Sequence, residues 1–153
     1  MTRAWALVAL ATMLATEATA LSCLRPDAAR SFNAAAHATE VYHVYFGELT
    51  LSDKLPDGGS TKATFHGQGL LKHGFSPISD REFTLVSRCA AEWCGSMAPQ
   101  TTALFFARVT DSGTVVDVAP CDNWIFVAPA PEIIKTIEAC MRGEPCEEGP
   151  LFR

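Results

Sequence analysis

The sequence lacks the patterns that mark most catalytic and nucleic-acid-binding sites. It contains neither a G-x-S-x-G nor an H-E-x-x-H motif, the signatures of serine hydrolases and of zinc proteases. Runs of lysine or arginine are absent, and the net charge is -5 at pH 7. Proteins that bind nucleic acid usually carry a basic patch, which this composition does not provide. We therefore expect neither an enzyme nor a nucleic-acid-binding protein.

Closely spaced metal ligands are also missing. The cysteine spacings Cys89-x4-Cys94 and Cys140-x5-Cys146 differ from the C-x2-C pairs of structural zinc sites. The same spacings exclude a redox C-x-x-C pair. The four histidines are not spaced like the ligands of a known metal site; they are His37, His43, His66 and His73. We expect the isolated protein to hold no metal and no cofactor.

The one long apolar run lies at the start of the chain. After a positively charged start, the apolar segment 4–14 leads to the small-x-small site Ala18-Thr19-Ala20, which is the build of an export signal. Glu17 interrupts the run before the roughly 18 to 20 apolar residues that a membrane helix needs, and no later segment approaches that length. We predict a signal peptide over residues 1–20, a mature chain that starts at Leu21, and a secreted or periplasmic protein.

The mature chain, residues 21–153, has the length of one domain. All six cysteines lie in it, and an even number of cysteines in an exported chain of this size indicates disulfides. Their spacing alone leaves the pairing open. A rival interpretation makes Cys23 the lipid-bearing residue of an envelope lipoprotein, because small residues precede it. The charge of Glu17 argues against this alternative.

The residue pattern predicts a mainly β protein. Runs rich in β-branched and aromatic residues are separated by turn residues. The expected strands cover residues 40–51, 62–72, 81–87, 102–109 and 114–119. Gly47 suggests a bulge or bend in the first strand. Asp27 is expected to cap a helix over 28–36, and a second helix is expected over 131–142. This pattern predicts a five-stranded OB-like barrel with a short helix near each end, stabilised by disulfides.

Several short motifs are informative through their joint order. The expected mature chain opens with Leu21-Ser22-Cys23, with Pro26 close behind. Glu82-Phe83 precedes Cys94-Gly95, and Cys121-Asp122 follows shortly after the expected last strand. This order resembles the netrin-like domain, and within it the inhibitory domain of the tissue inhibitors of metalloproteinases. That family opens with Cys-x-Cys and has a Cys-Gly loop and a hairpin that ends in Cys-Asp. The resemblance spans most of residues 21–146.

The resemblance implies a disulfide pairing. In the family the third residue pairs with the cysteine of the Cys-Asp motif, and the first residue pairs with the cysteine of the Cys-Gly motif. Leu21 cannot form the second of these bonds, so a nearby cysteine is the substitute partner. The implied pairs are Cys23–Cys121, Cys89–Cys94 and Cys140–Cys146. The main alternative joins Cys23 to Cys94 and Cys89 to Cys121.

The resemblance also implies a class of function. In the inhibitors, the α-amine and carbonyl of the first residue chelate the protease zinc, and the second side chain enters the specificity pocket. The matching candidate wedge is Leu21, Ser22, Cys23 and Leu24. Other members of the netrin-like class are not inhibitors, so we expect a non-catalytic protein-binding module, with metalloproteinase inhibition as the alternative. Candidate aromatic contacts with a protein partner are Trp93, Trp124 and Phe126.

Overall fold

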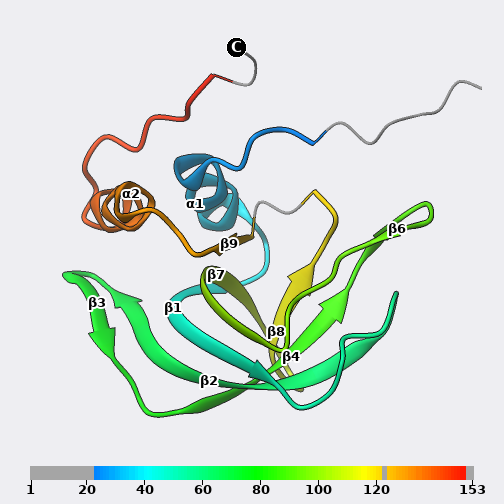
Figure 1. Cartoon of the computed structure of the whole chain (residues 1–153). Helices are drawn as coiled ribbons and strands as arrows, with labels where there is room; N and C mark the ends of the chain where they lie inside the picture. The colour runs from blue at the N-terminus through cyan, green and yellow to red at the C-terminus, as the bar shows by residue number, and fades with distance from the viewer. Residues whose placement is uncertain (1–22, 122–123, 151–153) are drawn as a thin grey trace, which may run out of the picture.

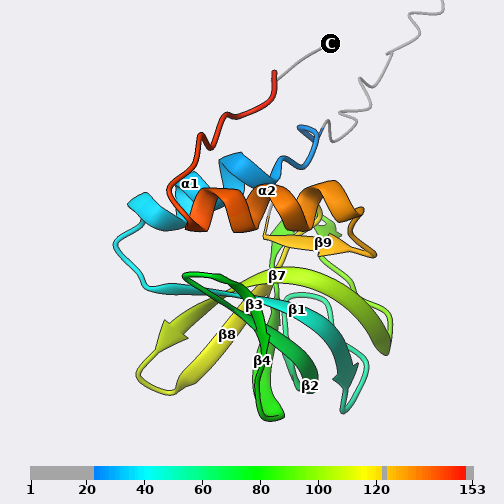
Figure 2. The same cartoon turned by 90° about the vertical axis from the view of Figure 1, so that its left-hand side faces the viewer.

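A computed structural model describes residues 23–121 and 124–150. The predicted signal peptide, Leu21 and Ser22 lie outside the described residues. Two helices, α1 (Ala28–His37) and α2 (Pro131–Met141), lie side by side over one end of a curved β-sheet (Figure 1). Figure 2 shows α2 passing above that sheet. Both helices occur where the sequence predicts them.

The sheet closes into a barrel of five strands. These strands are β1 (Tyr42–Leu51), β2 (Ser60–Leu71), β4 (Arg81–Ser87), β7 (Gln100–Thr110) and β8 (Gly113–Val118). Their order around the barrel is β1, β2, β4, β8 and β7, and β7 pairs with β1 to close it. Only β4 and β8 run parallel; the other neighbours are antiparallel. This arrangement confirms the predicted OB-like, mainly β fold.

Aromatic rings fill the interior of the barrel. Tyr45, Phe65, Phe83 and Phe105 are each at most 4 % exposed. The three phenylalanine rings meet edge to face, with centroids 5.3 to 5.6 Å apart. Edge-to-face contacts of this kind add to the free energy gained from burial alone. Buried and more exposed residues alternate along β4, because Phe83 and Leu85 point into this core.

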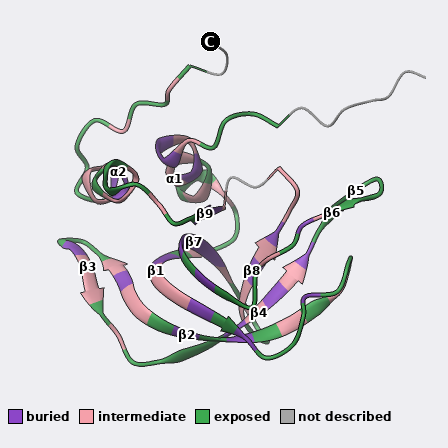
Figure 3. Cartoon of the chain, in the orientation of Figure 1, coloured by how far each residue is buried: buried purple, intermediate pink, exposed green. Residues whose placement is uncertain are grey.

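A second apolar cluster joins the outer face of the barrel to the helices. Val44 of β1 and Leu104 and Phe106 of β7 pack with Ile137 of α2 and with Phe126. Both faces of β1 and β7 are therefore buried near their centres (Figure 3). Phe126 is only 5 % exposed, so its prediction as an exposed contact residue is wrong: the helices cover the face of the sheet on which it lies.

Four short strands were not expected from the sequence. They are β3 (Gly74–Pro77), β5 (Cys89–Ala90), β6 (Trp93–Cys94) and β9 (Ile125–Val127). β3 pairs with β2, β9 extends the sheet beside β7, and β5 and β6 form a separate hairpin. The expected bulge at Gly47 is also wrong. The register of β1 with β2 is unbroken, and Gly47 lies opposite Gly67.

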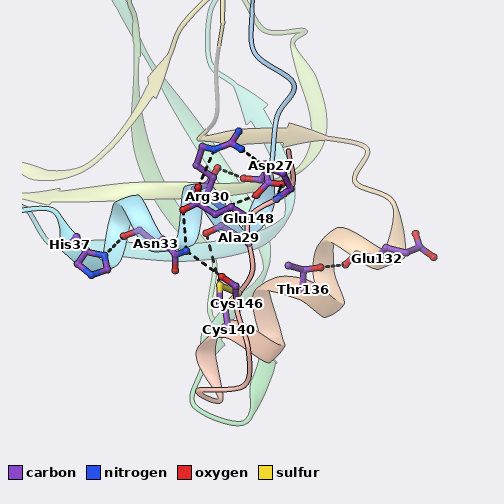
Figure 4. Close-up of a disulfide and its surroundings, with 12 residues drawn as sticks. Asp27, Ala29, Arg30, Asn33, His37, Glu132, Thr136, Cys140, Cys146 and Glu148 are labelled. Carbon is purple, nitrogen blue, oxygen red and sulfur yellow. Dashed lines mark hydrogen bonds and ion pairs between the residues drawn. A yellow bond between two sulfur atoms is a disulfide. The ribbon is translucent and has the colours of Figure 1, made fainter. Parts of the chain in front are cut away.

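The chain after α2 lies along α1 (Figure 4). Asp27 caps α1 as predicted, because its carboxylate accepts a hydrogen bond from the backbone N–H of Arg30 at 2.7 Å. The other carboxylate oxygen accepts from the backbone N–H of Gly149 at 2.9 Å. The Arg30 guanidinium pairs with Glu148 at 3.3 Å. These contacts, with the Cys140–Cys146 disulfide at the end of α2, hold the tail against the helix.

Candidate functional site

The three disulfides have the pairing that the resemblance implies. Cys23 is bonded to Cys121, Cys89 to Cys94, and Cys140 to Cys146. The alternative that joins Cys23 to Cys94 is therefore wrong. The first bond ties the start of the described chain to the segment after β8. The second closes the β5–β6 hairpin, because its two cysteines are directly opposite each other in the register.

Two of these disulfides lie at one side of the barrel, which we call the disulfide end. It comprises residues 23–26, the segment 89–97 that contains the hairpin, the segment 118–121 and the adjoining strand β9, residues 125–127. The backbone N–H of Arg88, just before the hairpin, donates to the carbonyl of Val118 at 2.8 Å. Gly95, just after the hairpin, is packed so closely that a Cβ there would collide with the same carbonyl oxygen. Figure 1 shows the hairpin, the end of β8 and the first described residues gathered on this side.

The disulfide end carries an apolar hollow of about 240 Å³. Its lining residues carry no charge and are Ser96, Met97, Val118, Ala119, Pro120, Ile125 and Val127. Large apolar side chains face solvent in this part of the molecule: Val127, which lines the hollow, is 63 % exposed, and Trp93 and Leu24 of the disulfide end are 54 % and 41 % exposed. Exposed apolar residues that cluster beside a hollow are typical of interaction surfaces. This arrangement can accept an apolar side chain from another protein.

The predicted aromatic contacts divide into exposed and buried residues. Trp93 is exposed on the hairpin. Trp124 is packed instead, stacked on Tyr42 with ring centroids 4.8 Å apart and edge-on to Phe106 at 5.7 Å. Burial also raises the pKa of the Tyr42 phenol above its usual value. Of the three predicted aromatics, Trp93 is exposed, Trp124 is half-buried and Phe126 is buried.

The wedge residues are only partly described. Leu21 and Ser22 lie outside the described residues, so their prediction as zinc-chelating and pocket-filling groups stays a prediction. Cys23 and Leu24 are exposed and belong to the disulfide end. The contribution of Val127 was missed, because β9 is too short to be recognised from its three residues.

The histidines lie apart. His66 pairs with Asp80 at 2.7 Å on the open surface, and His43 lies 3.4 Å from the hydroxyl of Tyr45. Within residues 23–121 and 124–150, no three histidine, cysteine or acidic side chains form a group that could hold a metal ion. In the same part of the chain, no helix is long and apolar enough to span a membrane.

The fold and the disulfides define a helix-covered OB-type barrel. Comparisons with protein-family models, with curated proteins and with solved structures give no match for the chain. Because one fold can serve many functions, the barrel by itself does not assign one.

Proposed function

We propose that the protein is an exported, non-catalytic protein-binding module that contacts its partner through the disulfide end. The observation that carries this proposal is that the disulfide end exposes Trp93, Leu24 and Val127 and carries an uncharged hollow, which Val127 lines. Two disulfides restrain the segments that present Leu24 and Trp93, and the pairing of β9 with β7 holds Val127, so little conformational entropy is lost when a partner binds. Disulfides are also typical of secreted and periplasmic proteins.

Photo-crosslinking tests this proposal. A photoreactive phenylalanine analogue at position 93 should capture a discrete protein from the native extracellular or periplasmic fraction, because the tryptophan there is exposed on the hairpin of the disulfide end. Positions 24 and 127 should capture the same protein. Val109 on β7 provides the control, since it is 41 % exposed and lies outside the disulfide end. Equal capture from position 109, or different proteins from positions 93 and 127, would contradict the assignment.

A second candidate function is inhibition of a zinc metalloproteinase. It is favoured by the Cys23–Cys121 bond, which is the pairing that the resemblance implies for the inhibitory domain. The free amine of Leu21 would then chelate the protease zinc. We expect the mature chain to inhibit at least one protease of a zinc-metalloproteinase panel, and a form with one alanine before Leu21 to inhibit it at least tenfold less. Equal inhibition by both forms, or none by either, rejects chelation by the N-terminus.

The lipoprotein alternative for Cys23 is disfavoured. A sulfur atom in a disulfide cannot also carry a thioether-linked lipid, and Cys23 is bonded to Cys121. The bond therefore supports a mature N-terminus that is held against the barrel by protein contacts.

A further inference from the structure

A second apolar region lies on another part of the molecule, where the helices meet β1 and β2. It consists of two hollows of about 170 and 400 Å³. Both are lined by His43, Val44, Leu70 and Met141, so they adjoin along these four side chains. We call the pair the helix groove. None of its lining residues belongs to the disulfide end, so it is separate from the proposed protein-binding surface.

The inner hollow is lined mainly by apolar side chains, with Tyr42 and His43 as its polar residues. Phe32 and Ala35 of α1 form one wall, and Phe106 of β7 forms another. Met141 lies at the boundary with the outer hollow and is 38 % exposed. Methionine is unbranched and flexible, so it can move aside for an occupant more easily than a branched side chain can. The inner hollow therefore suits an alkyl chain.

The outer hollow carries positive charge at its edge. Lys72, in the turn between β2 and β3, and Arg81, the first residue of β4, both line it. No aspartate or glutamate lines either hollow, although the whole chain has 17 acidic and 12 basic residues. An anionic group at this edge would therefore meet two cations and no directly opposing carboxylate.

The two cations have no partner within the described part of the chain. Most of the other arginines pair with carboxylates; these are Arg30, Arg88, Arg108 and Arg142. Lys72 and Arg81 form no such ion pair in residues 23–121 and 124–150. The two carboxylates that flank Arg81 in sequence are already engaged, since Asp80 pairs with His66 and Glu82 pairs with Lys62. The charges of Lys72 and Arg81 are available to a ligand.

We propose that the helix groove binds a free, single-chain anionic amphiphile of the fatty-acid class. Its alkyl chain occupies the inner hollow against Phe32 and Phe106, and its carboxylate lies at the outer edge near Lys72 and Arg81. The combined space lies within the range of small-molecule pockets in proteins. The occupant is a single free molecule and not a bilayer, because the apolar part lies between α1 and the barrel and not on a protruding surface.

Calorimetric titration of the mature protein with laurate, below its micelle concentration, tests the proposal. We expect saturable binding of one laurate per chain. Affinity should rise about two- to fourfold per methylene from octanoate to laurate, because each added methylene removes apolar surface from water. Dodecyltrimethylammonium, which has the same chain and the opposite charge, should bind at least tenfold more weakly.

Charge-reversal variants locate the carboxylate. The double substitution Lys72→Glu and Arg81→Glu should weaken laurate binding by at least about tenfold. The control is Lys54→Glu, which changes the charge of another exposed lysine outside the groove and should leave binding unchanged within about twofold. Circular dichroism checks that each variant is folded. For the unmodified protein, nitroxide-labelled laurate should broaden the NMR signals of Ala35 and Phe106 and not those of Trp93.

Several results would overturn the proposal. These are no saturable binding of laurate, equal affinity for laurate and the cationic amphiphile, and equal weakening by the Lys54 and the Lys72/Arg81 variants. Binding to phosphatidylglycerol vesicles without binding of free laurate would assign the groove to a membrane surface instead. None of these outcomes depends on the protein partner of the disulfide end, so the two proposals fail independently.

Discussion

Replacing both Cys23 and Cys121 by serine should lower the free energy of unfolding by about 4 to 5 kcal/mol, which is the largest stability effect that we expect from any disulfide of this protein. The two residues are 98 positions apart in the sequence, so the bond removes much of the conformational freedom of the unfolded chain. Cys23 is exposed and precedes α1, so little core packing is lost with it. Urea unfolding at 25 °C, followed by tryptophan fluorescence, measures the change.

The matched control is the paired substitution of Cys89 and Cys94. These residues are only 5 positions apart, so the same chain-entropy argument gives a loss of about 2 kcal/mol. Both variants remove one disulfide and add two hydroxyl groups, and the loop length is the main difference between them. Equal losses for the two variants, or a larger loss for the hairpin, would show that chain entropy does not govern the stability of this fold.

The barrel could be predicted from the sequence because its strands carry their own pattern. In β4 the alternation of Phe83 and Leu85 with more exposed residues marks one buried face, as expected for a half-buried strand. β7 contains the consecutive apolar residues Leu104, Phe105 and Phe106. Phe105 points into the barrel, and its two neighbours point to the helices. A strand buried on both faces loses its alternation and keeps only its hydrophobicity.

The short strands could not be predicted, because their stability comes from partners distant in sequence. β9 has three residues and exists through its register with β7, in which Phe126 lies opposite Leu104. β3 contains both Gly74 and Pro77, which are unfavourable in strands, and it forms by pairing with the end of β2. For the same reason the burial of Phe126 was missed: no local signal shows that a helix many residues away covers it.

The candidate sites also differ in how far the sequence could predict them. The Cys23–Cys121 bond could be anticipated through the resemblance, because cysteines and their neighbours form recognisable short motifs. The hollow beside Val127 and the helix groove could not, since each is assembled from segments that only the fold brings together. Lys72 and Arg81 belong to different elements, and neither has a neighbouring motif that indicates a shared ligand. Their significance follows from their place in a hollow that no carboxylate lines, which is a property of the folded surface.

The glycines of β2 provide the second large prediction. Gly67 lies opposite Gly47 where β1 and β2 approach closely, and the Phe65 ring covers the pair. A Cβ at Gly67 would be 2.5 Å from the carbonyl oxygen of Phe46 and 2.7 Å from the Phe65 ring. Because backbone and a fully buried ring must both move, Gly67→Ala should destabilise the fold by about 3 kcal/mol.

Gly69 in the same strand is the matched control. A Cβ there would lie 3.5 Å from the nearest atom, a methyl group of Ile78, which is ordinary van der Waals contact. Gly69→Ala also restricts the unfolded chain, so it should change stability by less than about 1 kcal/mol, with stabilisation the expected direction. Urea unfolding of both variants at 25 °C separates the two sites. Similar losses at positions 67 and 69 would mean that β2 tolerates no added methyl group for a general reason, such as strand coiling, and that the close approach of Gly67 to Gly47 is not the cause.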